Sequence, residues 1–152
     1  MAGLTNKGIA HILHATFRRT AIPTNYFVAL VTNAVVPTED TNTLGELTQI
    51  AIGNGYTTGG FSLTPGVTDF NEWFEDDTGN LAYVRIKDVF WLAAGGPIPA
   101  SGAGASYAVL TDDNGTVGSR EIYAYWTVGA GISVSDTQTL TLQDLELRGT
   151  QV

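Results

Sequence analysis

The sequence contains no cysteine, which excludes several kinds of site. A chain without thiols forms no disulfide, holds no metal through thiolates and has no thiol nucleophile. Histidine is nearly missing too, since the 152 residues include only His11 and His14. Both lie in one short segment with no acidic residue near them. The sequence therefore predicts neither a Ser–His–Asp triad nor a histidine metal site, and no cofactor is expected.

Charged residues are scarce as well, at 14% of the chain, and they are unevenly distributed. The net charge is −8, yet the first 19 residues hold Lys7, Arg18 and Arg19 and no acidic residue. The rest of the chain has four basic and fifteen acidic side chains, a net charge of −11. Because such a body repels a phosphate backbone, nucleic acid is not expected as a partner.

Long apolar runs are also missing. The strongly apolar segment Tyr26–Val31 is far shorter than the roughly 20 residues that a membrane-spanning helix needs. The first 19 residues have apolar residues at helical spacing, but no unbroken apolar segment of the kind that a secretion signal contains. The sequence therefore predicts a soluble protein with no membrane partner.

What the chain has in quantity is glycine, at 18 of 152 residues, together with threonine, alanine, valine and tyrosine. This composition favours strands and tight turns. We expect a mainly β fold, a β-sandwich or an open β-barrel, with one N-terminal α-helix. Residues 1–152 would form a single domain, with a helix or arm at 5–19, a β body at 25–147 and a loose tail at 148–152.

The helix predicted at residues 5–19 is amphipathic. Thr5 is a suitable N-cap, and Arg18 and Arg19 suit the negative end of the helix dipole. Helical spacing places four apolar residues on one face, namely Ile9, Ile12, Leu13 and Phe17. The capping-box pattern of Thr43 and Glu46 predicts a second, shorter helix at residues 44–50.

Several strands follow from alternating or continuous apolar patterns. Asn25–Val31 is apolar on both faces, which predicts a central strand. Leu81–Leu92 alternates most clearly, and its even-numbered face is the better core candidate. Asp88 interrupts that face, which indicates a bulge or the end of the strand.

An acidic segment at residues 69–77 is interleaved with aromatic residues. Its five carboxylates are Asp69, Glu72, Glu75, Asp76 and Asp77, and its aromatic residues are Phe70, Trp73 and Phe74. A solvated loop with its aromatics tucked under the body explains the pattern, and so does a contact between subunits. A Ca²⁺ site or a pair of catalytic carboxylates remains an alternative, although the spacing does not fit an EF-hand.

Residues 93–105 carry no charge and consist mostly of small residues and two prolines. This composition predicts either a flexible loop or a segment packed closely on another backbone. In the second case the segment is a candidate contact with neighbouring molecules.

The segment Ser106–Leu147, with the turn Asp112–Gly115 and the strand Ile122–Trp126, resembles the closing region of small virion-associated structural proteins of tailed bacteriophages. The opening, Gly3–Phe17, is similar to the short N-terminal helix of many such proteins. The resemblance implies a structural role in the virion, as a capsid decoration protein or as a tail or fibre component. We favour the decoration protein, a trimer bound to the major capsid protein that reinforces the shell. The resemblance transfers no catalytic residue and implies that the chain is not an enzyme.

Two other functions stay open at this point. One is a tail or fibre module that binds a host-surface glycan through exposed aromatics, and the other is a carboxylate-based or metal-dependent glycan-active enzyme. For an assembling protein, the candidate interface residues are Ile9, Ile12, Phe17, Arg18, Arg19, Trp73, Phe74, Pro97, Ile98 and Pro99.

Overall fold

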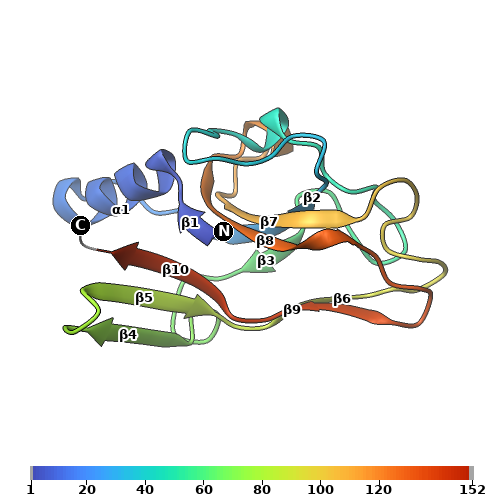
Figure 1. Cartoon of the computed structure of the whole chain (residues 1–152). Coiled ribbons are helices and arrows are strands. Elements are labelled where there is room, and N and C mark those ends of the chain that lie inside the picture. The colour runs from blue at the N-terminus through green and yellow to red at the C-terminus, as the bar shows by residue number, and fades with distance from the viewer. Residues whose placement is uncertain (1, 151–152) are drawn as a thin grey trace.

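The computed structural model describes residues 2–150 and confirms a mainly β fold with one α-helix near the start. Figure 1 shows two layers of strands, with the helix at one end of the molecule. In chain order the elements are β1 (Ala2–Leu4), α1 (Asn6–Arg18), β2 (Tyr26–Val31), the 3-10 helix η1 (Leu44–Glu46), β3 (Phe61–Leu63), β4 (Glu72–Asp76), β5 (Leu81–Ile86), β6 (Val89–Leu92), β7 (Ala105–Thr111), the 3-10 helix η2 (Val117–Ser119), β8 (Ile122–Ile132), β9 (Thr139–Leu142) and β10 (Leu145–Thr150).

The first layer is an antiparallel sheet of five strands in the order β1-β8-β7-β2-β3. As predicted, β2 is apolar on both sides, and Val28, Ala29, Leu30 and Val31 are completely buried. Val28 and Leu30 face the main core, whereas Ala29 and Val31 face a smaller cluster on the other side of the sheet. This sheet is therefore covered on both faces along its centre.

The second layer is a ribbon made of two shorter sheets, β10-β5-β4 and β6-β9. The prediction of one strand over Leu81–Leu92 is wrong. Within the ribbon, the chain leaves the β10-β5-β4 sheet after Ile86 and enters the β6-β9 sheet at Val89. The pairing register nevertheless continues across the break, with Ile86 opposite Leu145 and Val89 opposite Leu142. Both strands of the ribbon are interrupted at the same level.

The break changes which residues face the core. Ile86 is buried, but beyond the break Val89 and Trp91 are buried while Phe90 is 54% exposed. Of the predicted even-numbered core face, only Ile86 is buried, Val84 is half-buried and Ala82 is exposed, and beyond the break the odd-numbered residues face the core. The partner strand turns at the same level, where Asp144 has a left-handed φ of 55°, so the apolar side of the ribbon stays toward the first layer.

Three further predictions differ from the structure. The second helix is only the three-residue η1, although its capping box is present. The acidic segment at 69–77 forms strand β4 at the edge of a sheet instead of a loop. The expected tail begins too early, because β10 pairs with β5 through Thr150 and this brings residues 148–150 into the sheet. Residues 151–152 of that tail lie outside the described residues.

The main core lies between the two layers and draws residues from both. Its larger members include Leu30, Tyr56, Ile86, Trp91, Ile98, Trp126 and Leu140. No helix in residues 2–150 is both long and apolar enough to cross a membrane.

Candidate binding groove

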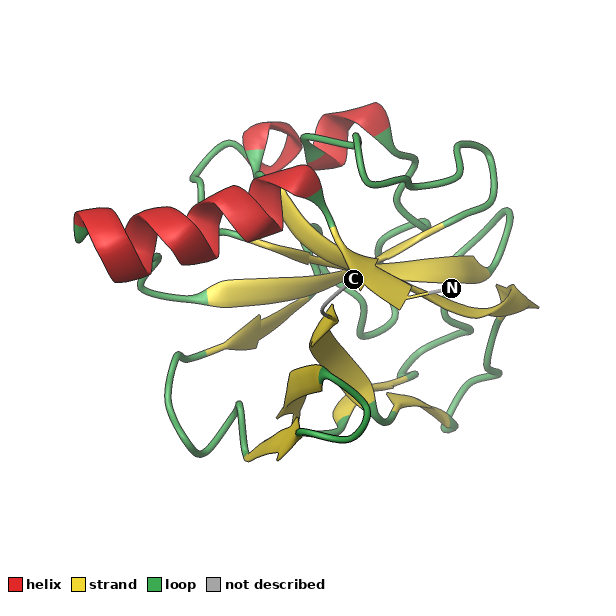
Figure 2. Ribbon diagram, turned by 60° about the vertical axis from the view of Figure 1, so that its left-hand side comes forward, coloured by secondary structure: helices red, strands yellow, loops and turns green. Residues whose placement is uncertain are grey.

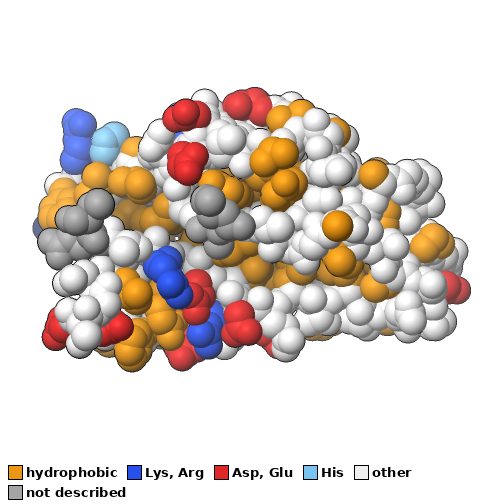
Figure 3. Space-filling model, in the orientation of Figure 1, with side chains coloured by type: hydrophobic (Ala, Val, Ile, Leu, Met, Phe, Trp, Pro, Cys, Tyr) orange, Lys and Arg blue, Asp and Glu red, His pale blue; other side chains and the backbone are white. Residues whose placement is uncertain are grey.

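A groove of about 830 Å³ opens at the end of the sandwich next to α1. It lies between α1, the first layer and the β4–β5 hairpin, where the two layers are not closed by further side chains. Figure 3 shows hydrophobic side chains gathered on the surface at this end of the molecule. The volume is in the range of sites that hold small ligands or anchoring side chains of a partner.

Three parts of the fold line the groove, mostly with apolar groups. The first layer contributes Leu4, Tyr26, Leu110 and Tyr123, the second layer contributes Trp73, Phe74, Tyr83, Val84 and Leu147, and α1 contributes Gly8, His11 and Ile12. Phe70, which precedes β4, also lines it. Because Leu4, Tyr26, Phe70 and Leu147 also pack on the main core, the groove is an uncovered continuation of that core.

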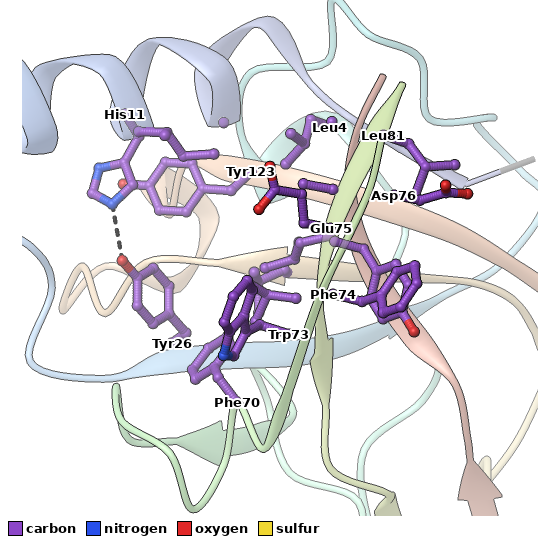
Figure 4. A pocket seen from close by; sticks show the side chains of 18 of the residues that line it. Leu4, His11, Tyr26, Phe70, Trp73, Phe74, Glu75, Asp76, Leu81 and Tyr123 are labelled. Carbon is purple, nitrogen blue, oxygen red and sulfur yellow. Dashed lines mark hydrogen bonds between the residues drawn. The ribbon is translucent and has the colours of Figure 1, made fainter. Parts of the chain in front are cut away.

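His11 and two tyrosines form the polar part of the groove wall (Figure 4). The His11 ring stacks on Tyr123, with ring centroids 4.4 Å apart and planes at 12°. Its Nε2 lies 2.9 Å from the Tyr26 hydroxyl, at hydrogen-bond distance. Burial lowers the pKa of His11, against an opposing effect of Glu121 and Asp112. The lowered pKa favours the neutral imidazole, and the contacts with the two tyrosines hold the ring in place in the groove wall.

The two tyrosines are also shifted toward their neutral forms. Burial and the nearby carboxylates of Asp113 and Asp112 raise the pKa of Tyr26 to about 12. Burial and the same acidic neighbourhood raise the pKa of Tyr123 as well. This side of the groove therefore presents rings and hydroxyl groups, while Glu75 on β4 brings a carboxylate into the groove from the other side (Figure 4).

α1 is attached to the body through its N-terminal half, from the Thr5 cap to His11. The Thr5 side chain accepts a hydrogen bond from the Gly8 amide and donates one to the Ile122 carbonyl. A Cβ atom at Gly8 would lie 2.0 Å from the Tyr123 carbonyl oxygen, so only glycine permits this approach. Gly8 is the one buried residue of the helix. Figure 2 shows α1 outside the two layers of strands.

The apolar face predicted for α1 is present, but the body of the protein does not cover it. Ile9, Ile12 and Leu13 are 47–48% exposed, and Phe17 is 77% exposed. Helical spacing turns Leu13 and Phe17 roughly a third of a turn or more away from Gly8, which faces the sheet. Arg18 and Arg19, at the far end of the helix, make no ion pair within residues 2–150.

The acidic segment at residues 69–77, which includes β4, borders the groove on the side opposite α1. Two of its five carboxylates are paired, since Glu72 contacts Arg85 at 2.6 Å and Asp69 contacts Lys87. The hydrogen bond from Lys87 lowers the pKa of Asp69. The other three line the groove and form no ion pair in the described part of the chain; they are Glu75, Asp76 and Asp77.

The aromatic residues of β4 are not tucked under the body. Trp73 is 74% exposed, and Phe74 is 47% exposed while stacking on Tyr83 at a centroid distance of 5.5 Å. The loop interpretation with hidden aromatics is therefore wrong for these two residues. Across residues 2–150 no group of three His, Asp or Glu side chains is arranged to hold a metal ion, so the acidic segment shows no ready cation site.

The structure separates the predicted interface residues into three groups. Ile12, Trp73 and Phe74 meet at the groove, and Ile9, Phe17, Arg18 and Arg19 are exposed on α1 beside it. Pro97 is exposed elsewhere. Ile98 and Pro99 are buried, which corrects the prediction that their side chains are free for a neighbour. The backbone of Ile98 pairs with Val134 at 2.9–3.0 Å, and this bridge draws the uncharged segment into the core.

Several groove residues were not singled out from the sequence. Tyr26, Tyr123 and Leu147 lie on predicted strands, where an aromatic or aliphatic residue normally indicates core packing. Nothing in their spacing indicates that three distant segments end at one uncovered surface. For His11, the sequence signal that points to the groove is its position one turn after Gly8.

No family model matches the sequence, and neither a curated protein nor a solved structure matches it significantly. The function of the chain is therefore inferred from the groove and the surface around it.

Proposed function

We propose that this chain is a virion structural protein of a tailed phage, a capsid decoration protein that reinforces the shell by binding and not by catalysis. The observation that supports this proposal is the unpartnered apolar face formed by α1, the groove and the β4 aromatics. Single exposed apolar residues are common, but a contiguous apolar surface of this size is typical of an interaction site.

The composition of the face fits a protein partner. Aromatic residues are enriched at the centres of protein interfaces, and Trp73, Phe74 and Phe17 are the most prominent side chains here. A face that binds neighbours in a shell is repeated on every copy. Modest affinity at each contact then adds up to firm attachment through avidity.

Glycan binding by a tail or fibre module is the second candidate. Trp73 favours it, because a tryptophan ring 74% exposed at a sheet edge can stack on a sugar, and Glu75 and Asp76 nearby could accept hydrogen bonds. The mostly apolar lining of the groove favours the assembly function, since sugars need a larger number of polar partners.

The proposal is tested on the particle. Purified chain is mixed with shells of the major capsid protein from the phage that carries the gene, and binding is followed by co-sedimentation. We expect saturation at a fixed copy number per shell and a higher temperature of shell disruption. Phe17→Asp should weaken binding by more than about tenfold, whereas Leu92→Asp, an exposed apolar position on β6 outside the groove, should not.

Two results would count against this function. One is a folded chain that stays in the supernatant with intact shells. The other is saturable binding on a glycan array that Trp73→Ala abolishes while shell binding is absent, which would support the tail or fibre module instead.

A further inference from the structure

We infer that the groove is filled by α1 of a second copy of this chain. The inference rests on the proposed function, because it names the partner at the same groove. It commits to the apolar stripe of α1, formed by Ile9, Leu13 and Phe17, as the part that enters the groove of the neighbour, with Phe17 as the anchor.

The two surfaces match in chemistry. The stripe is a row of aliphatic side chains that ends in an aromatic ring, on a helix of thirteen residues. The groove lies between a helix and two sheets and is lined mostly by apolar side chains. An amphipathic helix lying in an apolar groove is a recurrent mode of protein recognition, with anchors spaced by three or four residues. Ile9, Leu13 and Phe17 have that spacing.

Charges match at the same place. Arg18 and Arg19 directly follow the anchor Phe17 and have no ion-pair partner in residues 2–150. Glu75, Asp76 and Asp77 border the groove and are equally unpaired in that part of the chain. A helix that enters the groove of another copy carries its two arginines to an acidic rim. This complementarity argues for a second copy over an uncharged apolar ligand.

The uncovered area is also close to what an interface needs. The six exposed side chains of the stripe and groove rim, Ile9, Ile12, Leu13, Phe17, Trp73 and Phe74, are between 47% and 77% exposed. Together they present on the order of 600 Å² of apolar surface per copy. When two copies exchange helices reciprocally, each contributes both its stripe and its groove, and with the groove wall added the area approaches the roughly 800 Å² per partner of a standard interface.

The helix cannot fill the groove of its own chain. Its first turn is held by the Thr5 cap, by the ion pair of Lys7 with Glu121 at 2.9 Å, and by the close contact of Gly8 with Tyr123. These contacts turn the stripe away from the sheet. Within residues 2–150 of one chain, nothing therefore covers either the stripe or the groove.

The first test measures the mass of the full-length chain by sedimentation equilibrium at neutral pH. We expect a concentration-dependent oligomer. Phe17→Asp should shift the midpoint of association to more than about tenfold higher concentration, and Leu92→Asp should leave it unchanged. Both positions are exposed, so circular dichroism should show that both variants fold. A wild-type chain that stays monomeric at every concentration overturns the inference.

The second test exchanges the charges. A variant with Arg18→Glu and Arg19→Glu, and another with Asp76→Arg and Asp77→Arg, should each associate more weakly than the wild type. Mixed together they should associate again, because each helix then meets a groove of opposite charge. No recovery in the mixture overturns the inference, since nonspecific loss of stability would not be repaired by mixing.

The third test uses the lack of native cysteine. Phe17→Cys in one copy and Trp73→Cys in a copy of different mass are mixed and mildly oxidised. A disulfide between the two kinds of copy supports the inference whatever the number of subunits, and its absence from a stable oligomer overturns it. A chain that is monomeric alone yet binds shells keeps the proposed function and loses this inference. A helix-exchanged oligomer that does not bind shells keeps this inference and loses the proposed function.

Discussion

His11 shows at the residue scale how the groove wall is linked to folding. Its ring lies against Tyr123 and its Nε2 meets the Tyr26 hydroxyl, so the folded chain favours the neutral imidazole. The groups that face it from the packed strands are these two tyrosines, and the carboxylates of Glu121 and Asp112 act on it from further away. Since burial has the largest effect, the pKa of His11 is lower in the folded chain than in the unfolded chain.

The expected pH dependence follows from that direction. Above about pH 6.5 both states are neutral and the contribution of His11 to stability is fully present. As the pH falls from there toward the lowered pKa, the unfolded chain takes up the proton first and the free energy of unfolding decreases. Urea unfolding between pH 7 and pH 5 should show this loss, and His11→Gln should reduce the slope. His14→Gln, at an exposed position of the same helix, is the control, and an unchanged slope in His11→Gln would contradict the assignment.

α1 shows at the element scale how one close contact sets the position of a helix. Its C-terminal half lies outside the body, and its orientation depends on the Thr5 cap, on Gly8 against the Tyr123 carbonyl and on His11 against Tyr123. Glycine normally weakens a helix, so its presence in the first turn has a packing reason here. If the first turn moves, the apolar stripe of α1 and the helix residues that line the groove move with it.

Gly8→Ala tests this contact, because helix propensity and packing predict opposite signs. Propensity alone would stabilise the chain by up to about 1 kcal/mol. The Cβ contact of 2.0 Å with backbone should instead lower the free energy of unfolding by about 1–3 kcal/mol. Gly115→Ala, where an added Cβ meets nothing within 4 Å, is the matched control. Thermal and urea unfolding measure both variants, and an equally stable Gly8→Ala would show that the helix adjusts freely.

The sequence predicted elements better than their relation to one another. The helix at 5–19, its N-cap Thr5 and the buried strand β2 follow from local patterns, and the structure has all three. Asp88 indicates a bulge or a strand end within Leu81–Leu92, and the break at residues 87–88 confirms it. The matching interruption of the partner strand at residues 143–144 is not predicted. In the same way, the sequence pattern shows the apolar face of α1. It does not show the groove, because α1 and strands of both layers form the groove together.

At the scale of the whole molecule, the two layers share one core except at the α1 end. β7 and the first half of β8, Ile122–Trp126, lie in the first layer with nearly all of their residues buried. The β4–β5 hairpin extends beyond the core, and β4 has no buried residue. The chain therefore combines a closed half, which holds the fold, with an open half, which holds the groove.

Hydrogen exchange should resolve these two halves. We expect amides of β7 and β8 to exchange only through global unfolding, and amides of β4 and β5 to exchange faster through local opening. Mass spectrometry of peptides from the two regions at one pH measures the difference. Equal protection in both regions would contradict the division, and protection of β4 that grows with protein concentration would show that the open half is covered by association.

The uninterrupted register of the ribbon has a consequence for how related chains can vary in length. Ile86 and Val89 on one strand stand opposite Leu145 and Leu142 on the other, with two residues between them on each side. An insertion on one side alone would shift every later pair by one residue and turn buried side chains outward. Homologous chains should therefore gain or lose residues at these two distant points together or at neither.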